Sequence, residues 1–331
     1  MNAVAAGQLY RKVRATLNPG AVHAGARRPF VFFLGGAPAL VNEMRIALLS
    51  GHEDGTISSE AAAALVTLDP ERTAVDTTDA RAVIWCVPSG GAAAAPLTRL
   101  VPLGLPVLVL TVDPQTTAPA GPPSAPKAGE AGDYAVDRIA IETLAGRFLP
   151  HLIDCCRGIE IAVGRQLPAL RETVCAKLTR DAALAALKIA GASAVIDHVP
   201  VLGIVLGAFA SAGDTVAITG IQMQLLLNIG ATYGRDPDLS AMWELLPIVG
   251  GGFGWRALAR ELSGFIPVGG MFIKAAIAYA GTVVVGEGGA YFYRHGTQMN
   301  AVDAARIYAD AKTSAAQFAR DVLAHFRSGS S

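Results

Sequence analysis

The sequence predicts an α/β domain with a mostly parallel sheet in its first half, followed by an all-α domain that contains an apolar helical hairpin. Residues 28–155 alternate short apolar runs of strand character with helical stretches, which is the order typical of a doubly wound sheet. Beyond about residue 157 the strand signals end, and long stretches with almost no charge begin. We therefore expect a basic N-terminal arm over 1–27, the α/β domain over 28–155 and the helical domain over 156–326.

Composition limits the class of protein. The 331 residues are 52% hydrophobic and 16% charged, which excludes disorder of the whole chain because disorder needs low hydrophobicity and high net charge. Lys+Arg and Asp+Glu both number 27, so we expect no nucleic-acid partner bound through bulk positive charge. Zero net charge favours self-association, and a homo-oligomer is therefore an expected assembly. The four cysteines form no C-x-x-C pair, and we expect no metal.

The N-terminal arm is basic. Arg11, Lys12 and Arg14 fall where a secretory signal would have its apolar region, and no acidic residue precedes Glu43. Two interpretations stay open, namely an arm that rests on anionic lipid and a solvated helix ahead of the first strand.

Three apolar runs predict strands, at 29–34, 82–87 and 106–112, because they are rich in β-branched and aromatic residues. They are apolar throughout, as expected of parallel strands covered on both faces. Helices are expected over 41–49 and 139–156. The five prolines of the segment 114–132 can join neither a helix nor a strand ladder, so this segment is predicted to be a disordered insert.

The first predicted strand is followed by Gly35-Gly36 and then a helix, a context in which backbone amides bind phosphate. The P-loop pattern G-x-x-x-x-G-K-[ST], counted from Gly35, needs glycine, lysine and a hydroxyl where this chain has Leu40, Val41 and Asn42. Without the lysine, nothing in the motif balances the phosphate charge, and without the hydroxyl a Mg²⁺ ligand is missing.

The other nucleotide-binding elements are also incomplete. A guanine-reading N-K-x-D would follow the third predicted strand, where the chain reads Leu110-Thr111-Val112-Asp113 and only the aspartate remains. No D-x-x-G precedes the second predicted strand. We therefore predict a degenerate P-loop NTPase-like domain in which Gly35, Gly36 and Asp113 are remnants of a nucleotide site that binds nothing. We expect no cofactor, no catalytic residue and no turnover.

Two apolar stretches dominate the second half. Residues 215–234 carry no charge and residues 262–286 carry only Lys274, so each is long enough to cross a bilayer as a helix. Small residues recur at the spacing that lets membrane helices approach closely, at Gly203 and Gly207 and at Ala276 and Ala280. The alternative is a soluble domain in which the hairpin is buried.

Asp214 and Lys274 are single charges of opposite sign in or beside these stretches. A lone charge inside a bilayer is costly, and an ion pair would offset that cost. We therefore predict that the two side chains approach within salt-bridge range across an antiparallel hairpin.

The text of residues 155–294 resembles the YcjF-like domain-of-unknown-function family. That family's domain occurs in bacterial inner-membrane proteins and behind Era-like GTPase domains, so the resemblance implies a membrane-associated helical domain preceded by a GTPase-like one. The residues that carry it are Pro200, Gly203, Asp214, Thr219 and Gln222; Tyr233-Gly234; Trp255-Arg256 with Arg260-Glu261-Leu262; and Lys274 with Ala278-Tyr279-Ala280-Gly281-Thr282.

Together these observations predict a bacterial pseudo-GTPase-like scaffold or regulator, located at the cell inner membrane with its N-terminal domain in the cytoplasm. Its expected partners are membrane lipid and a protein that the sequence does not identify. One alternative is a nucleotide-dependent membrane switch with an atypical phosphate loop. Another is an oligomeric membrane conduit lined by Asp214 and Lys274.

Overall fold

The computed structural model describes residues 11–52, 55–68, 76–91, 98–196, 203–237, 270–300 and 302–314. The chain divides into two compact units. The α/β unit comprises His23–Lys177 and Ala231–Gly234, and the second unit comprises Met1–Val22, Leu178–Gly230 and Arg235–Ser331. Each unit therefore combines segments that lie far apart in the sequence.

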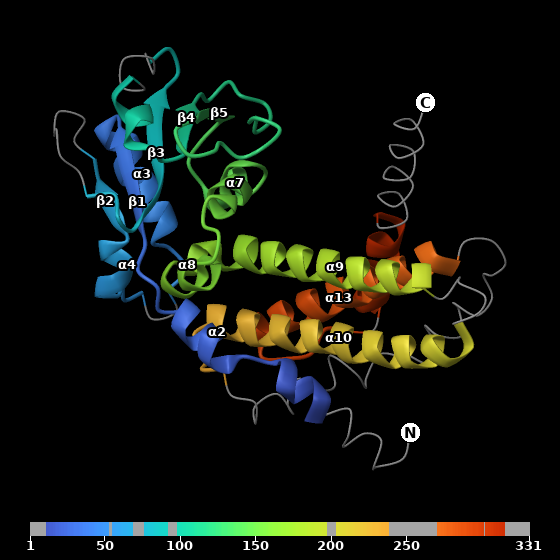
Figure 1. The fold of residues 1–331 in the computed structure, drawn as a ribbon. Coiled ribbons are helices and arrows are strands. Elements are labelled where there is room, and N and C mark those ends of the chain that lie inside the picture. Colours follow the sequence, from blue (N-terminus) through green and yellow to red (C-terminus); the bar gives the residue numbers. More distant parts are fainter. Residues whose placement is uncertain are drawn as a thin grey trace. The chain divides into compact units, whose positions relative to one another are not determined.

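One sheet of five strands forms the centre of the α/β unit (Figure 1). Its order is β2-β1-β3-β4-β5, and every neighbouring pair is parallel. The predicted α/β class and parallel sheet are therefore confirmed, and the architecture is consistent with a P-loop-like fold. The strands are β1 (Val31–Gly36), β2 (Leu65–Thr67), β3 (Ala80–Pro88), β4 (Val107–Val112) and β5 (Ala131–Val136).

The three strands predicted from the sequence are the three central ones. β1, β3 and β4 are buried over most of their length, as their continuous apolar runs indicate. The two edge strands are absent from the prediction. β2 has only three residues, and β5 begins with alternating exposed and buried positions, so neither shows a continuous apolar run.

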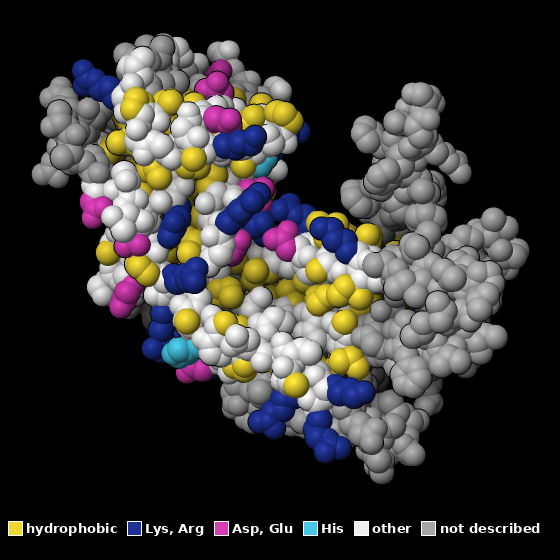
Figure 2. All heavy atoms as spheres, in the orientation of Figure 1, with side chains coloured by type: hydrophobic (Ala, Val, Ile, Leu, Met, Phe, Trp, Pro, Cys, Tyr) yellow, Lys and Arg dark blue, Asp and Glu magenta, His cyan; other side chains and the backbone are white. Residues whose placement is uncertain are grey.

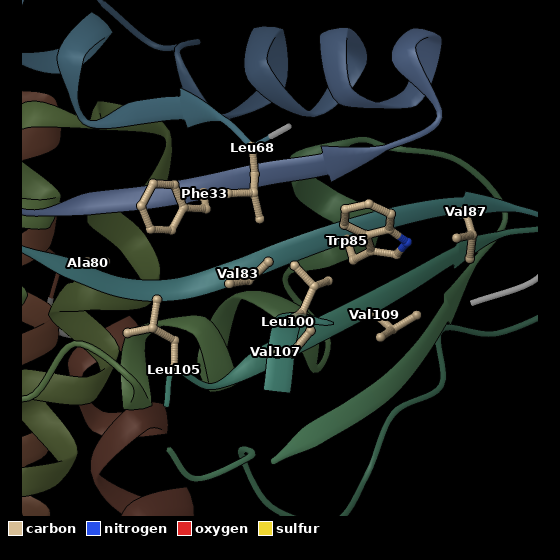
Figure 3. Close-up of a cluster of buried hydrophobic side chains, with 10 residues drawn as sticks. All are labelled: Phe33, Leu68, Ala80, Val83, Trp85, Val87, Leu100, Leu105, Val107 and Val109. Carbon is tan, nitrogen blue, oxygen red and sulfur yellow. The ribbon is translucent and has the colours of Figure 1, made fainter. Parts of the chain in front are cut away.

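Large apolar side chains make up the core of the α/β unit. Figure 3 shows a cluster of 10 buried residues that includes Phe33 of β1 and Trp85 of β3. Helix α3 (Pro38–Leu48) packs against β1 and β3 and buries Met44 and Leu48. The sheet is thus held by side chains of high volume, whose burial is the main favourable contribution to folding.

Short helices connect and flank the strands. The helix predicted over 139–156 is divided in two, because the residues between Leu144 and Phe148 form a turn that contains Gly146. The elements are α2 (Pro19–Gly25), α4 (Ser59–Ala63), η1 (Val101–Leu103), α6 (Ile141–Leu144), α7 (Phe148–Asp154), α8 (Glu160–Gln166) and η2 (Pro168–Leu170).

The proline-rich segment 114–130 lies along the outer edge of β5. Ala120 and Ala135 exchange two backbone hydrogen bonds of 2.9 and 3.0 Å, and the Pro122 carbonyl accepts one from the Arg147 guanidinium. Residues 131–132, the end of the predicted disordered insert, belong to β5. A segment without an apolar run thereby covers one edge of the sheet.

Long helices form the described part of the second unit. They are α9 (Arg171–Ile196), which begins in the α/β unit, α10 (Gly203–Thr232) and α13 (Gly270–His295), and residues 302–314 are also helical. Small residues make up part of their contacts, as in the buried cluster of Ala186, Ala190, Ala275 and Ala278. The buried Gln222 side chain of α10 donates a hydrogen bond to the Thr282 hydroxyl of α13 at 3.3 Å.

The predicted transmembrane helices, and the inner-membrane location based on them, are wrong. Within the part of the chain that the structure describes, no helix is both long and apolar enough to cross a membrane. α10 contains residues 215–232 of the first apolar stretch, and α13 contains residues 270–286 of the second, whose residues 262–269 lie outside the described residues. Buried polar residues such as Gln222 and Thr282 also interrupt their apolar character.

The predicted polar pair and helix-packing residues lie on these helices. Asp214 is in α10 and Lys274 is in α13, but both side chains lie outside the described part of the structure, and so does their predicted ion pair. Gly203 and Gly207 are in the first turns of α10, whose side chains are likewise outside it. Ala276 and Ala280 are buried on α13, and Ala280 clusters with Tyr308 and Ala311 of the 302–314 helix.

Candidate functional site

The carboxyl edge of the sheet is the candidate site, because parallel α/β sheets bind ligands there, next to the point where the strand order reverses. In this chain that point lies between β1 and β3, since β2 pairs on one side of β1 and β3 on the other. The described residues at this edge include Gly36, Pro88 and Asp113. Residues 69–75 and 92–97, which follow β2 and β3, lie outside the described residues.

The turn from β1 to α3 consists of a single residue, Ala37. Gly36 has a φ of +109°, and a Cβ atom there would collide with the backbone carbonyl of Cys86 on β3. The Ala37 amide donates a hydrogen bond to that same carbonyl at 2.9 Å. The backbone of this turn is therefore bound to the neighbouring strand, and the Ala37 amide is not available to a phosphate.

The first turn of α3 offers few other donors. A helix leaves its first four amides without partners inside the helix, and these are the groups that bind anions. Here Ala37 is the N-cap residue, without a side-chain cap, and Pro38 carries no amide hydrogen. Only the amides of Ala39 and Leu40 are left, and no lysine or arginine precedes Arg45 on this helix.

Gly35 serves the packing of β1 on β3. A Cβ atom at this position would collide with the indole ring of Trp85, which faces it across the strand pair. Both glycines that suggested a phosphate loop therefore have a packing role in the structure: one admits a tryptophan ring and the other a backbone carbonyl.

Asp113 follows β4 and closes its own turn. Its carboxylate accepts a hydrogen bond from the Gln115 amide at 3.0 Å, and its backbone carbonyl accepts one from the Thr116 amide at 2.8 Å. Its own amide donates to the Val136 carbonyl at 2.8 Å. Asp113 thus stabilises the connection from β4 into the segment 114–130, a role common for aspartate in turns.

Electrostatics at this edge do not favour a nucleophile. Cys86 is fully buried, and burial, with a smaller contribution from Glu43, raises the pKa of its thiol to about 12. The thiol therefore stays protonated at neutral pH, and a protonated thiol is a poor nucleophile. On the face shown in Figure 2, acidic and basic side chains are interspersed over the described surface.

A second polar cluster joins β5 to α7. The Tyr134 hydroxyl lies 2.9 Å from His151 Nδ1, and the Asp154 carboxylate pairs with Lys177 at 3.3 Å. Burial lowers the pKa of His151; Asp154 acts in the opposite direction and Arg147 in the same one. Burial also raises the pKa of the Cys155 thiol, to about 12. Both effects favour the neutral imidazole and the neutral thiol. The cluster therefore has the character of a structural contact between β5 and α7 and not of a reactive site.

Metal binding finds no support in the described ranges, where no group of three or more His, Cys, Asp and Glu side chains could hold an ion. His151 and Cys155 share a face of α7 at ligand spacing, but Cys155 donates a weak hydrogen bond to the Pro126 carbonyl at 3.9 Å and His151 contacts Tyr134. Two ligands are too few for a structural zinc site.

Two contacts near the site are not predicted from the sequence, namely that of Trp85 with Gly35 and that of Arg45 with β2. Trp85 lies in a predicted strand, but its contact with Gly35 depends on the register of β1 with β3. Arg45 lies on α3 and donates to the Leu65 carbonyl and the Thr67 hydroxyl of β2, a strand that the sequence does not indicate. No local pattern could have shown either contact.

Comparison with family models, with curated proteins and with solved structures finds no match to this chain. The resemblance of residues 155–294 to the YcjF-like family therefore stays a prediction.

Proposed function

We propose that the α/β unit is a degenerate P-loop NTPase-like domain that acts as a protein-binding scaffold or regulator without nucleotide turnover. The observation that carries this proposal is the one-residue turn between β1 and α3. A phosphate-binding loop needs several free amides and a lysine around the phosphate groups. Here the turn is bonded to Cys86, the helix begins with a proline, and the lysine is missing.

The described residues at the carboxyl edge of the sheet do not compensate for this turn. Asp113, the one residue that remains from a guanine-reading motif, directs its carboxylate to the Gln115 amide of its own turn. A guanine base would have to displace that hydrogen bond. These contacts support a fold retained for its surface and not for phosphate chemistry.

The second unit would be the helical half of this scaffold. We propose that residues 156–326 form an all-α domain in which α10 and α13 are the two arms of an apolar hairpin. The Gln222–Thr282 hydrogen bond and the approach of Leu226 to Gly289 support this arrangement. Buried hydrogen bonds of this kind specify which helix faces meet.

The test is direct binding of fluorescent GTP and ATP analogues to the full chain, with Mg²⁺ and with EDTA, followed by thermal unfolding at millimolar nucleotide. We expect no saturable binding and no change in Tm, since a ligand stabilises a protein only when its concentration approaches Kd. Saturable, Mg²⁺-dependent binding that Asp113→Ala weakens would overturn the proposal.

A further inference from the structure

β2 forms one edge of the sheet, and its two sides differ. The Phe32 amide donates to the Ala64 carbonyl at 2.7 Å, and the Leu68 amide donates to the Leu34 carbonyl at 2.8 Å, so Ala64 and Leu68 direct these groups towards β1. Backbone groups alternate in direction along a strand. The amide and carbonyl groups of Leu65 and Thr67 therefore point away from the sheet.

Arg45 of α3 occupies part of this outer side. Its guanidinium donates to the Leu65 carbonyl at 2.7 Å and to the Thr67 hydroxyl at 2.8 Å. Both acceptors are uncharged, and no ion pair joins Arg45 to a carboxylate of the described residues. A guanidinium forms stronger, often bidentate hydrogen bonds with a carboxylate than with neutral oxygens. Within the described residues, the β2 edge thus carries a cation that pairs with no carboxylate.

Apolar side chains are exposed on β2 itself, on α3 and ahead of α4. Val66 of β2 is 40% exposed, Ile57 ahead of α4 is 46% exposed, and Ile46 of α3 is 62% exposed. They are three of the five large hydrophobic side chains that are exposed in the described residues. The opposite edge differs, because the segment 114–130 covers β5 through the hydrogen bonds between Ala120 and Ala135.

We propose that the β2 edge binds an extended acidic segment of a partner protein as an additional strand. Arg45 selects this segment through its guanidinium. A carboxylate of the segment accepts hydrogen bonds from the Arg45 guanidinium in place of the Leu65 carbonyl. The Leu65 carbonyl can then accept a main-chain hydrogen bond from the segment. Neutral strands cannot displace Arg45 in this way, so the edge stays closed to them. The inference rests on the proposed function as a protein-binding scaffold and names the partner's chemistry.

The side-chain period of a strand determines the expected sequence of the segment. Thr67 points to the α3 side, where its hydroxyl meets Arg45, and its neighbour Val66 points to the other face of the sheet. An added strand should therefore place acidic side chains on the Arg45 side and apolar ones beside Val66. Alternation of acidic and apolar residues satisfies both, and main-chain hydrogen bonds supply the rest of the affinity.

The experiment measures fluorescence anisotropy of labelled peptides with the full chain at low salt. The probe is an alternating peptide of the sequence VDVDVDVD. The controls are the neutral VTVTVTVT, the basic VKVKVKVK and a block peptide, VVVVDDDD, which has the composition of the probe without its alternation. We expect saturable binding of the probe and binding of each control at least about tenfold weaker, the ratio that one charge-assisted hydrogen bond supplies.

Variants separate the contribution of Arg45 to peptide binding from that of the apolar contact at Val66. Arg45→Ala should weaken binding of the acidic probe and strengthen binding of the neutral peptide, so that the preference between them falls to about one. Val66→Asp should abolish binding of the acidic probe, because it places like charge and no apolar surface at the edge. Arg157→Ala is the matched control: it removes an exposed arginine from another part of the α/β unit and should change nothing.

Two results would overturn this inference, namely no binding of the acidic probe by the wild-type chain, or equal binding by wild type and both edge variants. Either leaves the proposed function standing if nucleotides also fail to bind. Mg²⁺-dependent nucleotide binding would instead refute the proposed function, whatever the peptides do.

Discussion

The α/β unit and the second unit differ in the residues at their closest contacts. In the α/β unit, the core consists of large side chains such as Phe33, Trp85 and Val109 packed on strands. In the second unit, helices also approach one another at alanine and glycine positions, as where Gly286 faces Thr179 and Gly289 faces Leu226. The sheet core is stable because large side chains fill its volume. The helix contacts at alanine and glycine form because these small residues let two helices approach closely.

This difference predicts opposite sensitivities. Removal of volume should damage the α/β unit most, because close-packed interiors relax only partly around a cavity. Addition of volume should damage the second unit most, because a helix contact through glycine has no room for a side chain. Hydrogen exchange resolves the two responses along one chain, since each unit has its own protected amides.

The largest expected effect is that of Trp85→Ala. The indole is 5% exposed and covers Gly35, so its loss leaves a cavity in the middle of the sheet. We expect the α/β unit to lose about 3–5 kcal/mol of its free energy of unfolding, the usual cost of deleting a buried aromatic side chain. Denaturant unfolding with hydrogen exchange of β1 and β3 amides measures this loss.

Trp85→Phe is the control for this change, because it keeps an aromatic ring and should cost less. Unchanged exchange of the β1 amides in Trp85→Ala would contradict the assignment of a volume-filling core. Exchange of the amides of α10 and α13 should stay close to that of the wild type.

An intermediate effect is expected for Gly286→Ala. The added methyl group would collide with the Thr179 side chain, which is 3% exposed. Overpacking of this kind costs about 1–3 kcal/mol, and it should exceed the gain in helix propensity from replacing glycine. Hydrogen exchange of α9 and α13 amides should accelerate. Addition of Thr179→Ala should recover part of the loss, and strictly additive effects of the two changes would argue against a direct contact.

The smallest expected effect is the pH dependence of stability that arises from the contact of His151 on α7 with Tyr134 on β5. Because burial lowers the pKa of His151, the unfolded chain binds this proton first as pH falls below about 6.5. The contribution of His151 to the free energy of unfolding should therefore decrease from about pH 6.5 downwards and level off below the folded pKa of His151. Thermal unfolding from pH 7.5 to pH 5 measures this slope.

His151→Gln should remove this part of the pH dependence. His295→Gln, which changes an exposed histidine of the second unit, is the matched control and should keep the wild-type slope. A slope that survives in His151→Gln would assign the pH dependence to another group.

The two units also differ in how far the sequence predicts them. The central strands are predictable because β1, β3 and β4 are continuous apolar runs. A short run of this kind is typical of a parallel strand that is buried on both faces of the sheet. The edge strands are not, because β2 and β5 become strands only by pairing with β1 and β4. In the second half, apolar composition predicts helices, but the transmembrane prediction was wrong, because no helix of the described residues is long and apolar enough to cross a membrane.

The sequence by itself determined that a parallel α/β unit forms and that the lysine and hydroxyl of a phosphate loop are missing after Gly36. Only the tertiary structure decided what the remaining residues do. Gly35 and Gly36 admit Trp85 and the Cys86 carbonyl, and Arg45 reaches β2, because strands and helices distant in sequence lie in register there. Such contacts depend on which segments pair, and a one-dimensional pattern carries no record of pairing.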